Sequence, residues 1–175
     1  MTDPMPTDEP APGCVRLTGF AGEANGDRWR MLNDNVMGGR SRGEVNFVNG
    51  TMMFSGFINT DGGGFSSVRY RLDAGALEGV GRMVLRARTD GRAYRLIAGD
   101  AASSRVVHRA ELAFEPSGGW QTVAMPLPAL TPSLRGDPVQ APPFDPARAS
   151  WLGLMLNDGK SGPFELIVDW IDVCG

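Results

Sequence analysis

The sequence predicts an all-β fold, a two-sheet β-sandwich with jelly-roll connections, and three observations support this prediction. Short segments rich in β-branched and aromatic residues recur along the chain, separated by Gly, Asn, Asp or Pro. Several segments alternate apolar and polar residues with a period of two, and helical periodicity is weak throughout. Glycine and proline account for 24 and 13 of the 175 residues, a proportion typical of a turn-rich fold.

Eleven segments have the composition of strands. The alternation is clearest near the end of the chain, where Phe164, Leu166, Val168 and Trp170 share one predicted face. The predicted strands are 15–20, 29–32, 43–48, 51–58, 65–72, 82–89, 93–98, 105–114, 120–127, 150–157 and 164–173.

The connections between these strands are predicted from turn residues. Asn49-Gly50 predicts a hairpin with a type I′ turn, because that turn needs positive φ at both central positions. Asp90-Gly91 indicates a second hairpin of the same kind. Residues 128–146 are rich in proline and are expected to form a long ordered loop across one sheet.

Residues 1–13 differ from the rest of the chain. They hold four prolines among small and acidic residues, and we interpret them as a disordered tail. The remaining residues, 14–175, are expected to form one β-sandwich domain. A chain of this size buries about 70% of its surface on folding, which is enough for a core without metals or crosslinks.

Composition and charge exclude several classes of protein. The chain has 17 Lys and Arg against 20 Asp and Glu, and this slightly negative balance argues against nucleic-acid binding. No apolar run approaches the roughly 18 residues that a membrane span needs. The first residues contain neither a basic nor an apolar leader, so we expect a cytoplasmic protein, and we also expect a monomer.

The two cysteines, Cys14 and Cys174, lie at opposite ends of the expected domain. Antiparallel pairing of the first and last strands would bring the thiols close enough for a disulfide. In a reducing cytoplasm, however, we expect two free thiols.

The densest polar cluster runs from Asn33 to Ser41, with the sequence NDNVMGGRS. Asn and Asp bond to their own backbone, and glycines permit turns that other residues cannot make. Two interpretations remain open. The cluster forms a tight, self-bonded loop, or it forms a polar binding pocket in which Asp34 accepts hydrogen bonds and Asn33, Asn35 and Arg40 contact the ligand.

Two further clusters are rich in glycine. Residues 61–67, DGGGFSS, lack the Lys-Ser/Thr of a phosphate-binding P-loop, so we expect their backbone to pack against a neighbouring loop. Residues 157–164, NDGKSGPF, are interpreted first as a hairpin loop. In the alternative interpretation, Asp158 and Lys160 contact a ligand.

Catalytic and metal-binding templates fit the sequence poorly. His108 is the only histidine and falls on the apolar register of its strand, which favours a buried structural role. Asp34 and Asp158 could supply the carboxylate pair of a glycoside hydrolase, although the sequence does not give their separation. One histidine and two terminal cysteines nearly exclude a zinc site, and calcium bound by loop oxygens remains open. We therefore expect no enzyme and no cofactor.

Strand register indicates one surface rich in arginine. Arg86 and Arg88 share a face of their predicted strand, Arg95 lies on the next strand, and Arg109 lies on the one after it. If these strands are neighbours, the arginines line one sheet face. That face is either solvated, with internal ion pairs, or a docking surface for an acidic or polyhydroxy partner.

Several motifs taken together resemble the complex I intermediate-associated protein 30 family. They are WRMLNDNVMGGRS from Trp29, GGFSS from Gly63, DGRAY from Asp90 and DGKSGPF from Asp158. The resemblance covers about residues 15–174. It implies a galactose-binding-like jelly-roll sandwich, and it implies an assembly factor or chaperone for respiratory complex I, the NADH:ubiquinone oxidoreductase, rather than an enzyme.

Two functions are therefore open. The first is a non-catalytic, protein-binding assembly factor whose clients are subunits of the respiratory complex. The alternative is a carbohydrate-binding module, which would need an exposed aromatic ring near the Asn and Asp loops, and Trp29, Trp151 and Tyr94 are the candidates. The residues expected to bind the partner or ligand are Asn33, Asp34, Asn35, Arg40, Arg86, Arg88, Arg95, Arg109, Asp158 and Lys160.

Overall fold

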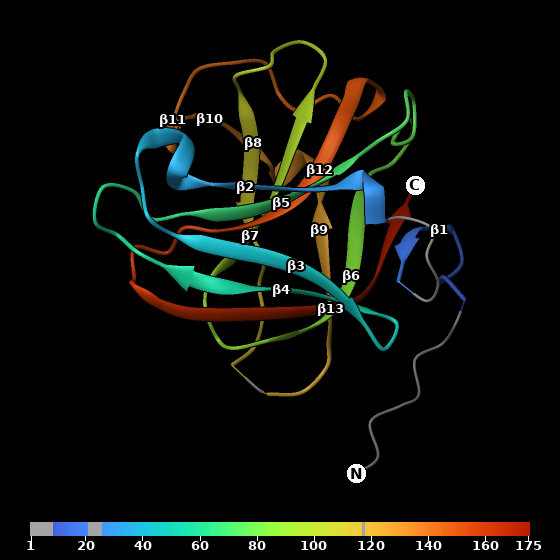
Figure 1. Cartoon of the computed structure of the whole chain (residues 1–175). Coiled ribbons are helices and arrows are strands. Elements are labelled where there is room, and N and C mark those ends of the chain that lie inside the picture. Colours follow the sequence, from blue (N-terminus) through green and yellow to red (C-terminus); the bar gives the residue numbers. More distant parts are fainter. Residues whose placement is uncertain (1–8, 21–25, 117) are drawn as a thin grey trace.

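The computed structural model describes residues 9–20, 26–116 and 118–175, and these form an all-β structure (Figure 1). All eleven predicted strands are present within a few residues of their expected bounds. The strands are β1 (Cys14–Gly19), β2 (Trp29–Asn33), β3 (Arg42–Val48), β4 (Thr51–Ile58), β5 (Ser66–Arg71), β6 (Arg82–Thr89), β7 (Tyr94–Asp100), β8 (Val107–Glu111), β9 (Gln121–Pro126), β10 (Thr131–Leu134), β11 (Asp137–Pro138), β12 (Ala149–Leu156) and β13 (Gly162–Cys174). Short 3-10 turns are η1 (Gly26–Arg28), η2 (Asp34–Met37), η3 (Leu127–Ala129) and η4 (Pro146–Arg148). None of the described helices is long and apolar enough to cross a membrane.

The strands form two antiparallel sheets. The six-stranded sheet has the order β3-β4-β13-β6-β9, with β1 also paired to β13. The seven-stranded sheet has the order β11-β10-β8-β7-β12-β5-β2. Because the chain crosses from one sheet to the other between most successive strands after β4, the connectivity is that of a jelly roll, as predicted.

The core lies between the two sheets and is built from the apolar positions of the alternating pattern. Phe54 of β4 and Tyr94 of β7 are fully buried, and their ring centroids are 6.5 Å apart. Phe164 of β13 packs edge-on against Phe54, with the ring centroids 5.0 Å apart. Buried residues of both sheets form one continuous hydrophobic cluster.

A β-bulge in β13 makes the prediction for Trp170 wrong. Phe164, Leu166 and Val168 face the core as expected. The register against β6 then shifts between Val168 and Trp170, which turns the Trp170 ring away from the core face. There it lies beneath the guanidinium of Arg16, whose central carbon is 4.9 Å from the ring centroid.

One predicted hairpin is confirmed and two others are not. Asn49 and Gly50 both have positive φ, 52° and 74°, and join β3 to β4 as a hairpin. Asp90-Gly91 instead carries the chain from β6 in one sheet to β7 in the other, and residues 157–161 similarly link β12 to β13. The Asp90 carboxylate accepts hydrogen bonds from the Tyr94 hydroxyl at 3.0 Å and from the Glu165 N–H at 2.8 Å, which directs the chain across the sandwich.

The proline-rich segment 128–146 contains two short strands, β10 and β11, that were expected to be loop. Pro132 has no backbone N–H to donate, but the side-chain hydroxyl groups on either side of it donate hydrogen bonds to β8. Thr131 Oγ1 donates to the Arg109 carbonyl at 3.3 Å, and Ser133 Oγ donates to the Val107 carbonyl at 2.8 Å. These bonds supplement the pairing of β10 with β8.

Cys14 and Cys174 form a disulfide, so the prediction of two free thiols is wrong. The two residues lie directly opposite each other in the antiparallel pairing of β1 with β13. Of the predicted tail, residues 1–8 lie outside the described residues. Just before β1, the Cys14 N–H donates to the Ala11 carbonyl at 3.0 Å, which forms a turn.

Candidate functional site

Asp34, immediately after β2, is fully buried and joins two loops. Its Oδ1 accepts the Ser41 N–H at 2.9 Å, and its Oδ2 accepts the N–H groups of Gly64 and Phe65 at 2.7 and 3.3 Å. Burial by itself would raise the pKa of the Asp34 carboxyl. The hydrogen bonds from Ser41, Gly64 and Phe65 outweigh burial and hold this pKa below its usual value.

Two glycines make room for this carboxylate. A Cβ at Gly39 would lie 2.3 Å from Asp34 Cγ, and a Cβ at Gly63 would lie 2.5 Å from Asp34 Oδ2. The motifs NDNVMGGRS and GGFSS therefore form one buried anchor, and the loop around Asp34 is of the tight, self-bonded kind. Asn33 belongs to the same anchor, because its Oδ1 accepts the Ser66 hydroxyl.

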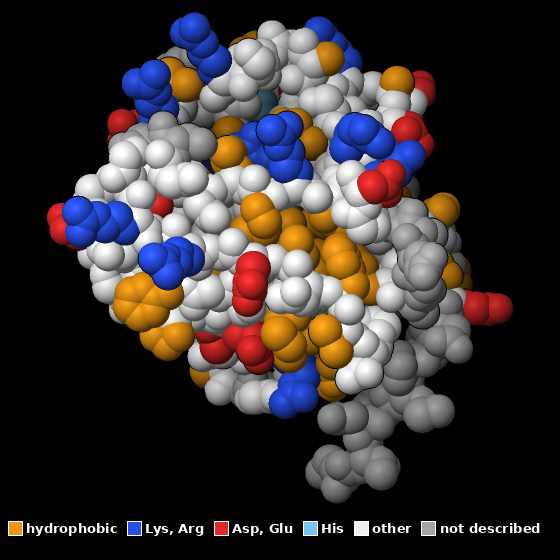
Figure 2. Space-filling view, viewed as in Figure 1, with side chains coloured by type: hydrophobic (Ala, Val, Ile, Leu, Met, Phe, Trp, Pro, Cys, Tyr) orange, Lys and Arg blue, Asp and Glu red, His pale blue; other side chains and the backbone are white. Residues whose placement is uncertain are grey.

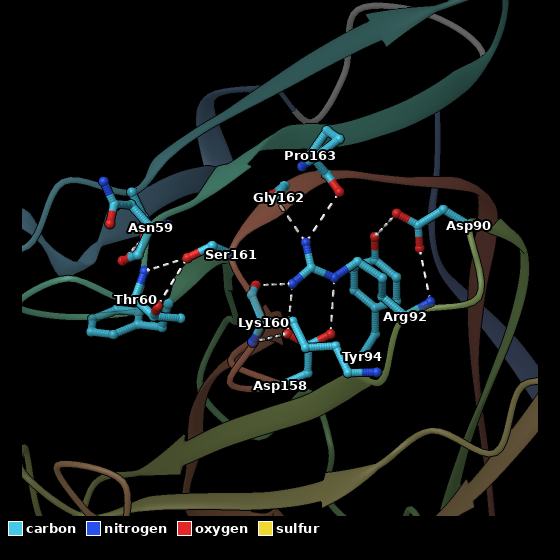
Figure 3. Close-up of polar contacts among 12 residues, drawn as sticks. Asn59, Thr60, Asp90, Arg92, Tyr94, Asp158, Lys160, Ser161, Gly162 and Pro163 are labelled. Carbon is cyan, nitrogen blue, oxygen red and sulfur yellow. Dashed lines mark hydrogen bonds and ion pairs between the residues drawn. The ribbon is translucent and has the colours of Figure 1, made fainter.

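A second anchor joins Asp158 to Arg92 (Figure 3). Arg92 Nε donates to Asp158 Oδ2 at 2.9 Å, and Arg92 Nη2 donates to Asp158 Oδ1 at 2.6 Å. Arg92 also donates to the carbonyls of Lys160, Gly162 and Pro163. Burial would raise the pKa of the Asp158 carboxyl, but the bonds from Arg92 and the Lys160 N–H hold it below its usual value.

The two anchors support neighbouring loops. Residues 59–65 precede β5, and residues 157–161 precede β13. The loops are joined where the Ser161 hydroxyl accepts the Thr60 N–H at 3.0 Å (Figure 3). Parts of both loops line a groove on the outer face of the seven-stranded sheet.

This groove has a volume of about 470 Å³, which is in the usual range for ligand sites. Its apolar lining comes from Leu32, Ile97, Val107 and Met155, which belong to β2, β7, β8 and β12. Arginines from β5, β8 and the β10–β11 turn surround this lining, namely Arg69, Arg109 and Arg135. Figure 2 shows Lys and Arg side chains gathered over this sheet, in the upper part of the view.

The arginines of the groove differ in their partners. Arg109 Nη2 donates to the Gly136 carbonyl at 2.6 Å, which ties β8 to the β10–β11 turn. Among the described residues, Arg69 Nε is buried and has no hydrogen-bond partner. Burial first, and the charge of Arg30 second, lower the pKa of the Arg69 guanidinium, while burial and then Arg95 lower that of Arg109.

A second hollow of about 560 Å³ continues the arginine-rich surface. It shares Leu32 and Arg69 with the groove and is also lined by Arg28, Arg30 and Arg71. These side chains were not predicted as site residues. The sequence signal that could have identified two of them is the alternation of the segment 65–72, which places Arg69 and Arg71 on one face.

The predicted arginine surface is split between the two sheets. Arg86 and Arg88 lie on β6 in the six-stranded sheet, whereas Arg95 and Arg109 lie on β7 and β8 in the seven-stranded sheet. The four residues therefore do not share one face, and that prediction is wrong. The error follows from the Asp90-Gly91 connection, which crosses the sandwich rather than forming a hairpin.

The two β6 arginines have local partners. Arg86 pairs with Asp169 at 2.8 Å, and its guanidinium carbon lies 4.6 Å from the Trp120 ring centroid. Arg88 lies 5.8 Å from the same ring and donates to the Gly118 carbonyl at 3.2 Å. This matches the interpretation in which a sheet face carries internal ion pairs.

The remaining predicted site residues lie outside the groove. Asn35, Arg40 and Lys160 are exposed, and Arg95 lies directly opposite Glu111 in the pairing of β7 with β8. None of these four lines the groove.

The aromatic candidates for sugar stacking are not free platforms. Trp29 and Tyr94 belong to the core. The Trp151 ring is covered on one face by Arg69, whose guanidinium carbon lies 3.9 Å from the ring centroid. Phe65, half-buried at the groove wall, is the aromatic residue that the sequence interpretation missed.

His108 and the two loop carboxylates have structural partners. His108 is buried, and its Nε2 lies 3.1 Å from the Pro142 carbonyl oxygen. Asp34 and Asp158 are both occupied by the bonds of the two anchors. Within the described ranges, His, Cys, Asp and Glu form no group of three or more that could hold a metal ion.

The fold of the chain is similar to that of several solved structures, among them two carbohydrate-binding modules and an agarase. The family 11 carbohydrate-binding module of the cellulase Lic26A-Cel5E of Clostridium thermocellum matches with a TM-score of 0.68 and 19% identity, covering 95% of this chain and 96% of the module. The same family's module in complex with a β-1,3-1,4-mixed-linked tetrasaccharide matches with a TM-score of 0.67 and 19% identity, covering 95% of this chain and 98% of that one. The agarase AgWH50C matches with a TM-score of 0.65 and 12% identity over 93% of this chain, but over only 25% of the enzyme. At these identities the likeness shows the fold alone, and that fold agrees with the galactose-binding-like sandwich.

Sequence comparison gives the family. No match was found among curated protein sequences. The family model for complex I intermediate-associated protein 30 matches residues 18–168, a range that includes both anchors and nearly all of both sheets. The chain therefore belongs to the complex I intermediate-associated protein 30 family.

Proposed function

We propose that this chain is a non-catalytic, protein-binding module that assists the assembly of respiratory complex I. The family name supplies the expected client, an intermediate of complex I. The observation that carries the proposal is the outer face of the seven-stranded sheet, where arginines surround an apolar groove. Such a surface is suited to hold a client, and the described residues that line it include no Asp, Glu, His or Cys that could act as an acid, base or thiol nucleophile.

The groove is suited to binding because its framework is rigid. Its floor comes from strands paired on both sides, such as β7 and β12, and its wall is fixed by the bonds to Asp34 and between Thr60 and Ser161. A preformed surface loses less conformational entropy on association than a flexible one. The groove can therefore bind a client without a large rearrangement of its own backbone.

Affinity purification of the tagged chain from its native cell tests this proposal. We expect complex I subunits among the captured proteins, at levels above those captured by an identically tagged family 11 carbohydrate-binding module. That module is a matched control because it has the same fold. Subunits of complex I at or below the control level would overturn the proposed function.

Carbohydrate binding is a second candidate function, and one feature of the groove favours it. Phe65 lies at the groove wall, and Asn157 Oδ1 is a buried acceptor with no partner among the described residues. A half-buried ring and a free amide oxygen in one groove can stack on a sugar and accept a hydroxyl hydrogen, respectively. A neutral-glycan array with the purified chain tests this candidate. Specific binding that is lost in Phe65→Ala would support it, and an array without signal would exclude it.

A further inference from the structure

We infer that the groove binds an extended acidic segment of the client protein, with two carboxylates of the segment on Arg69 and Arg109. An apolar side chain between these carboxylates would lie on the floor of the groove. This inference rests on the proposed function in one respect, namely that the client is a protein.

The charges of the groove lack compensation within the described parts of the chain. The groove has three arginines and no Asp or Glu among its lining residues. Arg69 makes no ion pair there, and its Nε is buried without a partner. The carboxylate of Asp137 raises the pKa of Arg109, but by less than burial lowers it. A half-buried cation without a counter-charge is unfavourable, so an incoming carboxylate would be stabilised.

The spacing of the two cations defines the ligand. Arg69, Gly153, Ile97 and Arg109 are direct neighbours in one row across β5, β12, β7 and β8. Three strand spacings separate the backbones of the two arginines, which is about 14 Å. In an extended peptide, side chains at positions i and i+4 lie on the same side and are about 13 Å apart. The acidic residues of the segment are therefore expected four positions apart.

The floor between the cations selects the residue in the middle. Ile97, which lies between the two arginines in this row, lines the groove, so the floor there is apolar. The residue at i+2 of an extended segment points to the same side as i and i+4. The inferred recognition pattern is acidic, any residue, apolar, any residue, acidic.

The arginines of the groove are complementary to a carboxylate. Guanidinium groups only donate hydrogen bonds, and an ionised carboxylate only accepts them. Arg135 adds a further donor at the groove edge, where it is exposed and held at φ 51° in the β10–β11 turn. Planar guanidinium groups match carboxylates in two-bond geometry.

Fluorescence polarisation with labelled peptides tests the inference. The probe is an acetylated, fluorescein-labelled peptide with the core Glu-Ser-Leu-Ser-Glu, and the matched control has Gln in place of both Glu residues. We expect saturable binding of the probe to the full chain at low salt and binding about tenfold weaker for the Gln peptide. A peptide with adjacent Glu residues should also bind more weakly, because it cannot reach both arginines.

Variants of the chain assign the binding to the groove. Arg69→Gln and Arg109→Gln are each expected to weaken probe binding about fivefold or more. Arg105→Gln is the matched control, because Arg105 is exposed and does not line the groove, and it should bind as the unchanged chain does. Because Arg69 packs on Trp151 and Arg109 holds a turn, Arg135→Gln serves as a third variant at an exposed position. Thermal unfolding of each variant confirms that it is folded.

Several outcomes would overturn the inference. These are no saturable binding of the probe, equal binding of the Glu and Gln peptides, unchanged affinity in the folded Arg69→Gln or Arg109→Gln variant, or binding of oligogalacturonate in place of the peptide. Capture of complex I subunits by an Arg69→Gln, Arg109→Gln double variant would overturn the inference and leave the proposed function standing. Probe binding without capture of complex I subunits would overturn the proposed function and leave the binding of an acidic segment standing.

Discussion

The carboxylate of Asp34 accepts a hydrogen bond of 2.7 Å from the backbone N–H of Gly64, thirty residues further along the chain. Gly64 and Phe65 are both bonded to this carboxylate, and both line the groove. Asp34 itself lies fully inside the fold. Its role is therefore to fix the backbone of the groove wall.

Replacing Asp34 should destabilise the protein. Asp34→Ala leaves the buried N–H of Ser41 and the partly buried N–H of Gly64 without an acceptor, which is expected to lower the free energy of unfolding by about 1–3 kcal/mol. Urea denaturation followed by tryptophan fluorescence measures this change. Asp61→Ala is the matched control, because that residue is exposed on the neighbouring loop. Equal stability of the two variants would show that the Asp34 bonds contribute little.

The stability of the fold should decrease in acid. The pKa values of Asp34 and Asp158 are held below the ordinary value of 3.8, so the folded state binds fewer protons than the unfolded state. Their contribution is complete above this ordinary value and is lost as the pH falls through the folded-state pKa values. Urea midpoints measured from about pH 6 to about pH 2 should fall, and should fall less steeply for Asp34→Asn. Identical slopes for the variant and the unchanged chain would contradict this prediction.

The two glycines beside Asp34 should not tolerate a side chain. Gly39→Ala and Gly63→Ala each place a Cβ against the anchored carboxylate, and we expect each to cost about 1–3 kcal/mol of unfolding free energy. Gly119→Ala is the matched control, since a Cβ there meets no atom within 4 Å. Differential scanning calorimetry of the three variants makes the comparison. A melting temperature for either anchor variant equal to that of Gly119→Ala would refute the packing argument.

The Arg92 anchor should stabilise the fold far more than a surface ion pair does. Arg92→Ala leaves the largely buried Asp158 carboxylate without its partner and also removes bonds to the 160–163 backbone. We expect a loss of about 3 kcal/mol, as for other buried pairs broken on one side. Arg28→Ala breaks the exposed pair with Asp73 and should barely change the unfolding midpoint. The prediction fails if the two variants unfold at the same urea concentration.

The disulfide should contribute measurably to stability. The Cys14–Cys174 bond closes a loop with a sequence separation of 160 residues, and removal of such a crosslink commonly costs about 2–5 kcal/mol. The Cys14→Ser, Cys174→Ser double variant, compared with the oxidised chain by thermal unfolding, measures this cost. A thiol titration of the unfolded, unreduced chain should find no free thiol. One free thiol per cysteine in that titration would restore the original expectation.

The fold could largely be predicted because each strand has its own local pattern. The alternation of Phe164, Leu166 and Val168 predicts their strand without reference to any other segment, and Asn49-Gly50 predicts the hairpin of β3 with β4. The residues of a strand and of its flanking turns do not indicate which of the two sheets the strand joins. Asp90-Gly91 has the composition of a hairpin turn, yet the Asp90 bond to the distant Glu165 N–H accompanies a crossing between sheets.

The site was harder to predict for the same reason. The motif around Asp34 is conspicuous in the sequence, but both of its interpretations fit the residue types, and only three-dimensional contacts decide between them. Arg69 and Arg109 are forty residues apart in the sequence. They lie beside the same groove only because β12 and β7 pair between their strands. The bulge before Trp170 is a shift in the pairing of β13 with β6, and the residues around it give no sign of it in the sequence.

The bond between Cys14 and Cys174 also determines how the molecule would respond to tension. The first and last strands are covalently joined at their outermost residues. A pull applied at Gly13 and Gly175 would therefore be borne by the cystine, and the strands between would carry no load. Tension between these two ends would leave the sandwich intact for as long as that crosslink is oxidised.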